Sequence, residues 1–255
     1  MTRVETGPGW ELRLGRWQEA LAHVTECDAV ITDPPYSERT HSAYGDESGQ
    51  YTGARIASQP ARRKLDYDAL TREGLTELTT HWAARAKGWT CWLTSHDLVP
   101  DYDANLSASG RYTFAPLPCV ISGMTCRLLG DGPSGESVSL VVARPRTREF
   151  AKWGTLRGFY YGASERCIVV GGKPLWLMRA IIRDYTRPGD VVLDPCAGGG
   201  TTLLAAVMEG RRAIGAECDE KTFEKAVARL RKGYTPTLFQ PEAAPMEQTA
   251  LWGAE

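Results

Sequence analysis

The sequence predicts an α/β fold in which helices cover both faces of a mostly parallel sheet. Short apolar segments alternate along the chain with segments whose apolar residues recur at helical spacing, the order that parallel sheets require. Turns rich in glycine, proline and aspartate separate these segments. With 255 residues, 42% of them hydrophobic and 24% charged, the chain has the composition of an ordinary globular domain.

The first half of the chain predicts three strands and two helices. In order, they are the strand Glu11–Leu14, the helix Trp17–Leu21, the strand Asp28–Thr32, a helix carrying Leu75, Leu78, Trp82 and Ala86, and the strand Trp89–Thr94. We expect Gly88 to end the second helix, because glycine commonly closes helices. The polar residues 37–64 predict a long loop, and a long loop inside a domain usually has a function.

The second half begins with a predicted strand pair and then alternates helix and strand. In order, the segments are Arg111–Ile121 and Ser137–Ala143 around the turn Gly130–Gly135, the helix Leu175–Tyr185, the strand Val191–Leu193, the helix Thr201–Met208, the strand Ala213–Ala216 and the helix Lys221–Arg231. Pro174 suits the first helical position, where no N–H is needed. Residues 144–172 are basic and irregular, and residues 233–255 predict a flexible tail.

Composition disfavours several classes of protein. No apolar run reaches the roughly 18 residues of a membrane span, and residues 1–10 lack a signal-peptide pattern, so we expect a cytoplasmic protein. The seven cysteines are odd in number and form no C-x-x-C pair. They predict reduced thiols rather than disulfides or a zinc cluster, and we expect no metal site.

A glycine-rich loop joins a predicted strand to a predicted helix. It reads Asp194-Pro195-Cys196-Ala197-Gly198-Gly199-Gly200-Thr201-Thr202. Glycines at such a junction let the backbone turn tightly and approach a ligand closely. Glu217 ends the next strand, where α/β nucleotide-binding folds carry a carboxylate for ribose hydroxyls.

The residues around these glycines indicate the charge of the ligand. A dinucleotide site has the pattern G-x-G-x-x-G, but Leu203 stands where its third glycine would be. The Asp194 carboxylate would repel a pyrophosphate and favour a cationic ligand. S-adenosylmethionine, which carries a sulfonium and an ammonium group, fits this requirement. A tight turn without any ligand is the alternative interpretation.

A second motif, Asp33-Pro34-Pro35-Tyr36, directly follows a predicted strand. Its prolines fix the backbone and remove two N–H donors, which leaves the Asp33 carboxylate and the Pro34 carbonyl as rigid acceptors. Two acceptors can hold an amino group on a flat ring and direct its lone pair at an electrophilic methyl group. Tyr36 can stack on the ring, which stabilises it by about 1–3 kcal/mol. A base would have to leave the duplex to reach this motif; a plain proline turn is the alternative.

Together the two motifs resemble the DNA amino-methyltransferases, which act on N6 of adenine or N4 of cytosine. Because the tetrapeptide precedes the glycine loop, the order resembles the circularly permuted beta class. The resemblance covers residues 11–36, 89–94 and 137–232, and it includes Lys173-Pro174 and Gly215-Ala216-Glu217. It implies a Rossmann-like, S-adenosylmethionine-dependent catalytic domain over residues 1–232, followed by the tail 233–255.

The resemblance also implies roles for individual residues. The catalytic residues would be Asp33, Pro34, Pro35 and Tyr36, with Asp33 also near the cofactor. The cofactor-binding residues would be Lys173, Asp194, Pro195, Cys196, Ala197, Gly198, Gly200, Thr201, Thr202, Glu217 and Cys218. Two positions depart from the family pattern: Gly15-Arg16 stands in place of Gly-Asp, and Cys196 stands where phenylalanine is common.

Basic residues gather in two segments. Between residues 144 and 187, ten Lys or Arg outnumber three acidic residues, and a second cluster lies within residues 55–64. Clustered positive charge suits a phosphate backbone, although it is also typical of a solvated surface. Beside the two motifs it predicts a DNA-contacting loop at 37–64 and a short target-recognition region at 144–172. The predicted DNA-binding residues are Arg39, Arg55, Arg62, Arg63, Arg146, Arg148, Lys152 and Arg157.

The predicted function is methyl transfer from S-adenosylmethionine to N6 of adenine in double-stranded DNA, at a specific site, by base flipping and direct transfer. Cytosine N4 stays an alternative, because only the aspartate at the first motif position favours adenine. An RNA base or a protein amide is a further alternative, and a DNA-binding module without catalysis is the non-enzymatic one. C5-cytosine methylation would leave the tetrapeptide without a role. We do not expect Ser95-His96-Asp97 to act as a hydrolase triad, because triads form in space rather than along the chain.

Double-stranded DNA is the expected partner, and a homodimer is left open. The segment Gln248–Trp252 loosely resembles peptides that dock on bacterial sliding clamps, although an unstructured end has the same composition. The resemblance further implies a bacterial or phage-encoded protein of the restriction-modification type.

Overall fold

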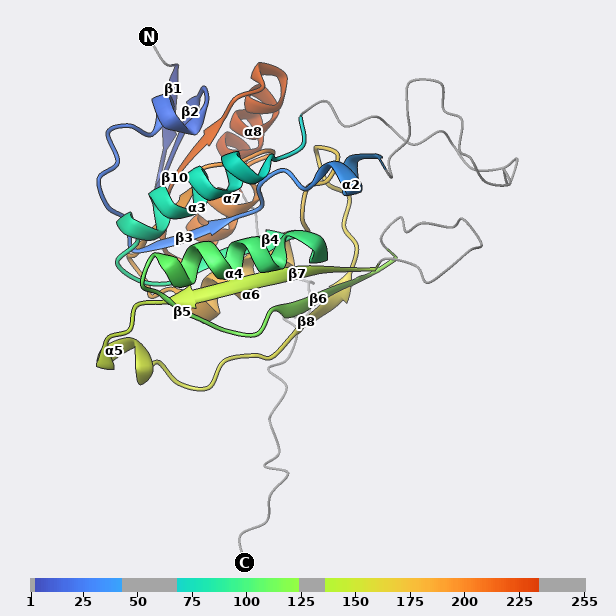
Figure 1. Cartoon of the computed structure of the whole chain (residues 1–255). Coiled ribbons are helices and arrows are strands. Elements are labelled where there is room, and N and C mark those ends of the chain that lie inside the picture. Colours follow the sequence, from blue (N-terminus) through green and yellow to red (C-terminus); the bar gives the residue numbers. More distant parts are fainter. Residues whose placement is uncertain (1–2, 43–67, 124–135, 234–255) are drawn as a thin grey trace, which may run out of the picture.

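The computed structural model describes residues 3–42, 68–123 and 136–233 (Figure 1). Several sequence predictions lie outside these residues. They are the turn Gly130–Gly135, most of the loop 37–64 with Arg55, Arg62 and Arg63, the tail beyond residue 233, and the segment Gln248–Trp252 within that tail.

The described residues form one mixed sheet in the order β1-β2-β10-β9-β3-β4-β7-β6-β8, with β5 also paired to β7. The strands are β1 Val4–Gly7, β2 Trp10–Leu14, β3 Ala29–Thr32, β4 Thr90–Thr94, β5 Tyr112–Thr113, β6 Leu117–Ser122, β7 Ser137–Arg144, β8 Tyr160–Ala163, β9 Val191–Asp194 and β10 Arg212–Glu217. The five neighbours from β2 to β4 are parallel. Because β7 is antiparallel to both β4 and β6, and β8 is parallel to β6, only β7 and the edge strand β1 run against the rest.

Helices cover both faces of this sheet, as the sequence predicts (Figure 1). The helices are α1 Trp17–Ala20, α2 Glu38–Ser42, α3 Arg72–Arg85, α4 Val99–Ala108, α5 Arg148–Ala151, α6 Leu175–Tyr185, α7 Thr201–Met208 and α8 Glu220–Lys232. One apolar cluster lies under α1, α3 and α4, and the other under α6, α7 and α8. Successive strand residues point to opposite faces, so Cys91 of β4 joins the second cluster and Trp92 joins the first. None of the described helices has the length and hydropathy of a membrane crossing.

The predicted boundaries of α6 and α7 agree with the structure, whereas others are wrong. The segment 37–64 is not a loop throughout, because it begins with α2. The helix α3 ends at Arg85 rather than at Gly88, because Ala86 turns into extended backbone and forms a bridge with Cys27. Gly88 instead lets two backbone segments approach closely, because a Cβ at this position would lie 2.5 Å from the Asp28 carbonyl oxygen.

Three further expectations need correction. The segment Arg111–Ile121 is two strands, β5 and β6, interrupted at Pro116, which has no N–H to donate to a ladder. The region 144–172 is not irregular throughout, since it contains the short elements α5 and β8. Pro174 caps α6 with extended backbone (ψ 141°) instead of occupying its first turn.

The parallel strands place both sequence motifs at one edge of the sheet. β3 pairs with β9, and β9 pairs with β10, all three in the same direction. Their carboxyl ends therefore meet, and ligands of α/β sheets bind beyond such ends. Asp33 directly follows β3, Asp194 ends β9 and Glu217 ends β10.

Candidate active site

A cavity of about 1280 Å³ opens at this edge and is lined by residues from both motifs. Most of the residues predicted for the cofactor line it. They are Asp33, Lys173, Asp194, Pro195, Cys196, Ala197, Gly198, Thr201, Thr202, Glu217 and Cys218, joined by Pro35 of the tetrapeptide. Pro34, Tyr36 and Gly200 do not line it. The fold thus brings together two motifs that are about 160 residues apart, as expected for neighbouring parallel strands.

A buried hydrogen bond ties the two strand tips together. The Thr32 hydroxyl, at the end of β3, donates to Asp194 Oδ1 at 2.6 Å, and the Cys196 amide donates to the same oxygen at 3.1 Å. Burial raises the pKa of Asp194 to about 6, although hydrogen bonds from Thr202, Thr32 and the Cys196 amide oppose the rise. Three hydrogen bonds thus hold a buried carboxylate at the tip of β9, and its negative charge favours a cationic ligand.

The glycine loop owes its shape to left-handed backbone at two positions. Gly198 has φ +50° and Gly200 has φ +70°, a region that residues with a Cβ rarely adopt. Gly200 is the N-cap of α7, so the first turn of that helix directs its amide groups toward the loop. The Ala197 amide donates to the Ala216 carbonyl at 2.8 Å, which fixes the loop against β10.

Glu217 occupies the part of the cavity beside β10. Its Oε1 accepts a hydrogen bond from the Asp219 amide at 2.7 Å. Burial raises the pKa of Glu217, and hydrogen bonds from the Asp219, Gly198 and Cys218 amides partly offset that rise. One carboxylate at the tip of the strand after the glycine loop is the arrangement that binds ribose hydroxyls in α/β nucleotide sites.

The tetrapeptide contributes a carboxylate with one oxygen paired and one available. Lys173 Nζ donates to Asp33 Oδ2 at 2.6 Å. Among the described residues, Asp33 Oδ1 is buried and has no hydrogen-bond partner. Burial raises the pKa of Asp33, while the charge and hydrogen bond of Lys173 and the nearby Tyr36 hydroxyl lower it. An unpaired buried acceptor is costly, so this oxygen is suited to a ligand that donates a hydrogen bond.

Two contributions to the cavity escaped sequence reasoning. Arg229 of α8 donates to the Thr201 hydroxyl at 2.8 Å and to the Gly199 carbonyl at 3.3 Å. These two hydrogen bonds fix the glycine loop against α8. Residues 167–170 line the cavity, with Ile168 against Gly199. Nothing in the local sequence signals the role of Arg229, since it lies on α8 among other basic residues.

The predicted DNA-binding residues do not all gather near the cavity. Since β7 runs against β4, it ends at the opposite edge of the sheet, and α5 follows there (Figure 1). Arg146, Arg148, Lys152 and Arg157 therefore lie away from Asp33. Only the later part of the segment 144–172 returns, along β8, to the cavity. Arg39 lies on α2, three residues beyond Tyr36.

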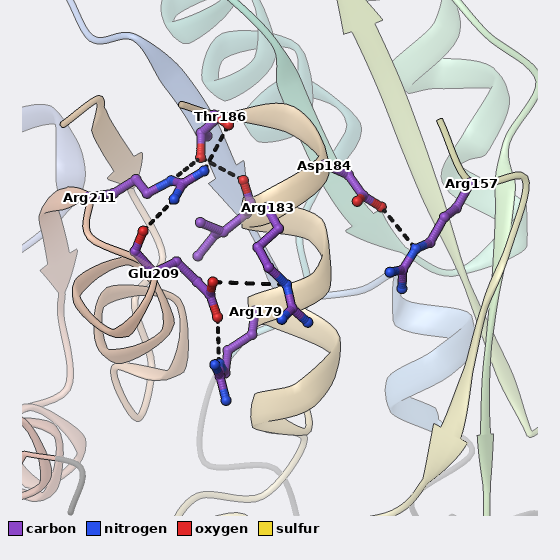
Figure 2. Close-up of polar contacts among 8 residues, drawn as sticks. Arg157, Arg179, Arg183, Asp184, Thr186, Glu209 and Arg211 are labelled. Carbon is purple, nitrogen blue, oxygen red and sulfur yellow. Dashed lines mark hydrogen bonds and ion pairs between the residues drawn. The ribbon is translucent and has the colours of Figure 1, made fainter. Parts of the chain in front are cut away.

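Several of the clustered basic residues form internal ion pairs (Figure 2). Arg179 and Arg183 of α6 both approach the Glu209 carboxylate, at 2.6 Å and 3.9 Å. Arg157 lies 3.7 Å from Asp184, near the carboxyl end of the same helix. The charge excess of this segment is thus partly neutralised within the fold and overstates the charge presented to a partner.

Gly215 offers a test of how tightly the loop is packed. A Cβ at this position would lie 2.9 Å from Leu203, 3.1 Å from Ala197 and 3.1 Å from the Asp194 carbonyl oxygen. We expect Gly215→Ala to lower the free energy of unfolding by about 1–3 kcal/mol, as overpacking does, and to weaken cofactor binding by displacing Asp194. Urea denaturation measures the first effect and calorimetric titration the second.

Gly158 provides the matched control, because a Cβ there would meet nothing within 4 Å and its backbone is not left-handed. Gly158→Ala should change neither quantity. Equal behaviour of the two variants would contradict the close packing of Gly215 against the loop.

Part of the sequence is similar to that of known DNA methylases and methyltransferases. The family model N6_N4_Mtase, described as DNA methylase, matches residues 159–228. The putative methylase YubD of Escherichia coli K12 is 41% identical over 80 residues, which cover 28% of this chain and 35% of that protein. The type II methyltransferase M.HindIII of Haemophilus influenzae is 48% identical over 61 residues, which cover 24% of this chain and 20% of that protein. The matches thus span about a third of these curated relatives or less.

The likeness in three dimensions extends over nearly the whole chain. The structure of an M1.HpyAVI–SAM complex superposes with a TM-score of 0.63 at 21% sequence identity, and the match covers 87% of this chain and 98% of that one. The fold is therefore that of M1.HpyAVI, a protein whose structure was solved with SAM bound.

Proposed function

We propose that the chain is a DNA methylase of the family that modifies N6 of adenine or N4 of cytosine, and that it transfers a methyl group from S-adenosylmethionine to N6 of adenine in double-stranded DNA. One observation carries the proposal: a carboxylate with an unpaired oxygen, Asp33, lies beside the glycine loop of Asp194 in one cavity, with Thr32 joining the two strand tips.

The residues present fit the cofactor. The buried Asp194 carboxylate suits a cationic ligand, Glu217 suits ribose hydroxyls, and the left-handed Gly198 and Gly200 leave the loop backbone open to close approach. When bound, S-adenosylmethionine supplies an electrophilic methyl group on a sulfonium. Cys196 also lines the cavity, as the resemblance implies for a cofactor-binding residue.

The tetrapeptide fits the acceptor amine. Asp33 Oδ1 and the Pro34 carbonyl would each accept one hydrogen of the amino group, and Tyr36 would stack on the base. An amino nitrogen that takes up the methyl group would acquire a positive charge and would have to lose one proton. Asp33 Oδ1 is the acceptor beside it, and burial raises the pKa of Asp33, which makes it a stronger base than an exposed aspartate.

Cytosine N4 is the alternative substrate, because the same two acceptors would hold its amino group. An RNA base or a protein amide is a further alternative, because each also presents an NH2 group to these acceptors. The DNA-contacting residues, a homodimer and the contact of Gln248–Trp252 with a sliding clamp stay predictions.

Methylation-sensitive long-read sequencing of DNA from cells that express the chain tests this proposal. We expect N6-methyladenine at one short sequence, absent from cells that express Asp33→Ala. N4-methylcytosine at such a sequence would select the alternative substrate, and unmodified DNA would contradict the proposed activity.

A further inference from the structure

The ammonium group of Lys173 lies between the two groups assigned to the target base. Its Nζ donates to Asp33 Oδ2 at 2.6 Å and lies 4.9 Å from the centre of the Tyr36 ring. A base amine held by Asp33, on a ring stacked against Tyr36, would need the same space. Lys173 thus occupies the position that the amine would need.

We infer that Lys173 is a positioning residue that exchanges partners: it holds Asp33 until the cofactor carboxylate binds, and then releases Asp33 to the target amine. This inference rests on the proposed function and adds to it an order of events, in which the cofactor prepares the base site.

The balance of charges supports the exchange. Lys173 has only 9% of its side chain exposed, and it pairs with a partly buried carboxylate. Breaking such a pair without replacement leaves uncompensated charge and is strongly unfavourable. The methionine part of the cofactor carries a carboxylate that replaces Asp33 as the partner of Lys173. The target amine then replaces Lys173 as a donor to Asp33.

The position of Lys173 permits this movement. Its ammonium lines the cavity shared by both motifs, and it has three donors, of which two are engaged, by Asp33 and by the Gly171 carbonyl at 3.1 Å. The bond to Gly171 comes from its own loop and can persist while the third donor finds a new acceptor. The four-carbon stem of lysine allows a compact charge to shift over a few ångströms.

A static role predicts different behaviour. If Lys173 stays on Asp33 throughout, the two ligands bind on either side of a fixed ion pair. Weakening that pair then has no reason to favour the cofactor. The exchange instead makes the Asp33–Lys173 pair a competitor of the cofactor carboxylate, so weakening it must strengthen cofactor binding.

The test is a double-mutant cycle on the full chain, with calorimetric titration of S-adenosylhomocysteine, which keeps the carboxylate and requires no DNA. We expect Asp33→Asn to tighten binding about fivefold or more, in the range of typical coupling energies. In the Lys173→Met background the same substitution should change the affinity by less than about twofold. Adenosine, which lacks the carboxylate, should bind the wild type and Asp33→Asn equally.

Equal or weaker binding of S-adenosylhomocysteine by Asp33→Asn would overturn the exchange. So would the same tightening in the Lys173→Met background, since Lys173 would then play no part. Thermal melts followed by circular dichroism report whether each variant folds. If one does not, a crystal structure of the wild type with S-adenosylhomocysteine decides: we expect Lys173 Nζ on the ligand carboxylate, and an intact Lys173–Asp33 pair would overturn the inference.

Failure of the proposed function gives a separate result. A wild-type chain that binds neither S-adenosylhomocysteine nor S-adenosylmethionine has no cofactor site, and the activity proposal falls. Binding by the wild type without an effect of Asp33→Asn leaves that proposal standing and removes only the exchange.

Discussion

Replacing Asp33 by alanine is expected to lower kcat by about 10²–10³-fold, the loss that follows removal of one directional hydrogen-bond partner from a transition state. Among the described residues that line the cavity, only Asp33 has a buried side-chain oxygen without a hydrogen-bond partner, its Oδ1. Without it, the amine lone pair stays delocalised into the ring and the departing proton loses its acceptor. Single-turnover transfer of a labelled methyl group to DNA measures the effect.

The control for this prediction is Glu38→Ala. Glu38 begins α2, five residues beyond Asp33, and its side chain is exposed. The substitution removes the same charge from the same side of the sheet without touching the cavity, so turnover should stay within about twofold of wild type. Turnover of Asp33→Ala that matches the control would contradict the assigned chemistry.

Replacing Asp194 by asparagine is expected to stabilise the fold at neutral pH while it weakens cofactor binding. Burial raises the pKa of Asp194 from its ordinary 3.8 to about 6. The folded state then binds this proton more tightly than the unfolded state does. The stability contributed by the protonated carboxyl is therefore complete below about pH 4 and is lost as the pH rises through 6.

Above pH 6 the wild type bears the cost of a buried charge, about 2–3 kcal/mol from the difference between the two pKa values. An asparagine at this position has no such cost, and its carbonyl still accepts from Thr32 and from the Cys196 amide. The stability of Asp194→Asn relative to wild type should thus increase between pH 4 and pH 8. Urea denaturation at pH 4, 6 and 8 measures this difference, and a difference that does not change with pH would contradict it.

The same substitution should weaken binding of S-adenosylmethionine at pH 8 by about tenfold or more, since a buried charge interaction is lost. If Asp194 binds the cofactor at the expense of stability, its replacement should stabilise the fold and weaken cofactor binding together. A variant that binds as tightly as wild type would show that Asp194 does not face the cationic part of the cofactor.

Local patterns in the sequence predicted much of the fold. The helices α6 and α7 begin and end at the predicted residues: the apolar residues of α6 recur at helical spacing, and α7 lies between Gly200 and Gly210, whose backbone is left-handed. Asp33 and Asp194 share a cavity because both follow strands that run parallel, which strand-helix alternation already indicates. The helix α4 was not predicted, because only Tyr102 and Leu106 are buried in it and two residues do not make a recognisable helical pattern.

What the sequence did not predict depends on contacts between distant segments. The antiparallel pairing of β7 with β4 sends Arg146, Arg148 and Lys152 to the far edge of the sheet, and no local pattern sets that direction. The ion pair between Lys173 and Asp33 joins residues 140 positions apart. Such pairings are decided by the tertiary fold, so their consequences for DNA contact and for cofactor exchange appear only in three dimensions.

Transfer of a labelled methyl group tests the account most directly. Purified protein is incubated with methyl-labelled S-adenosylmethionine and unmethylated DNA, the DNA is digested to nucleosides, and the labelled nucleoside is identified by mass spectrometry. We expect the label in N6-methyl-2′-deoxyadenosine, with about a hundredth of it or less after the same incubation with Asp33→Ala. DNA without label, from a wild-type protein shown by calorimetry to bind the cofactor, would contradict the claim that this cavity joins a methyl donor to a base amine.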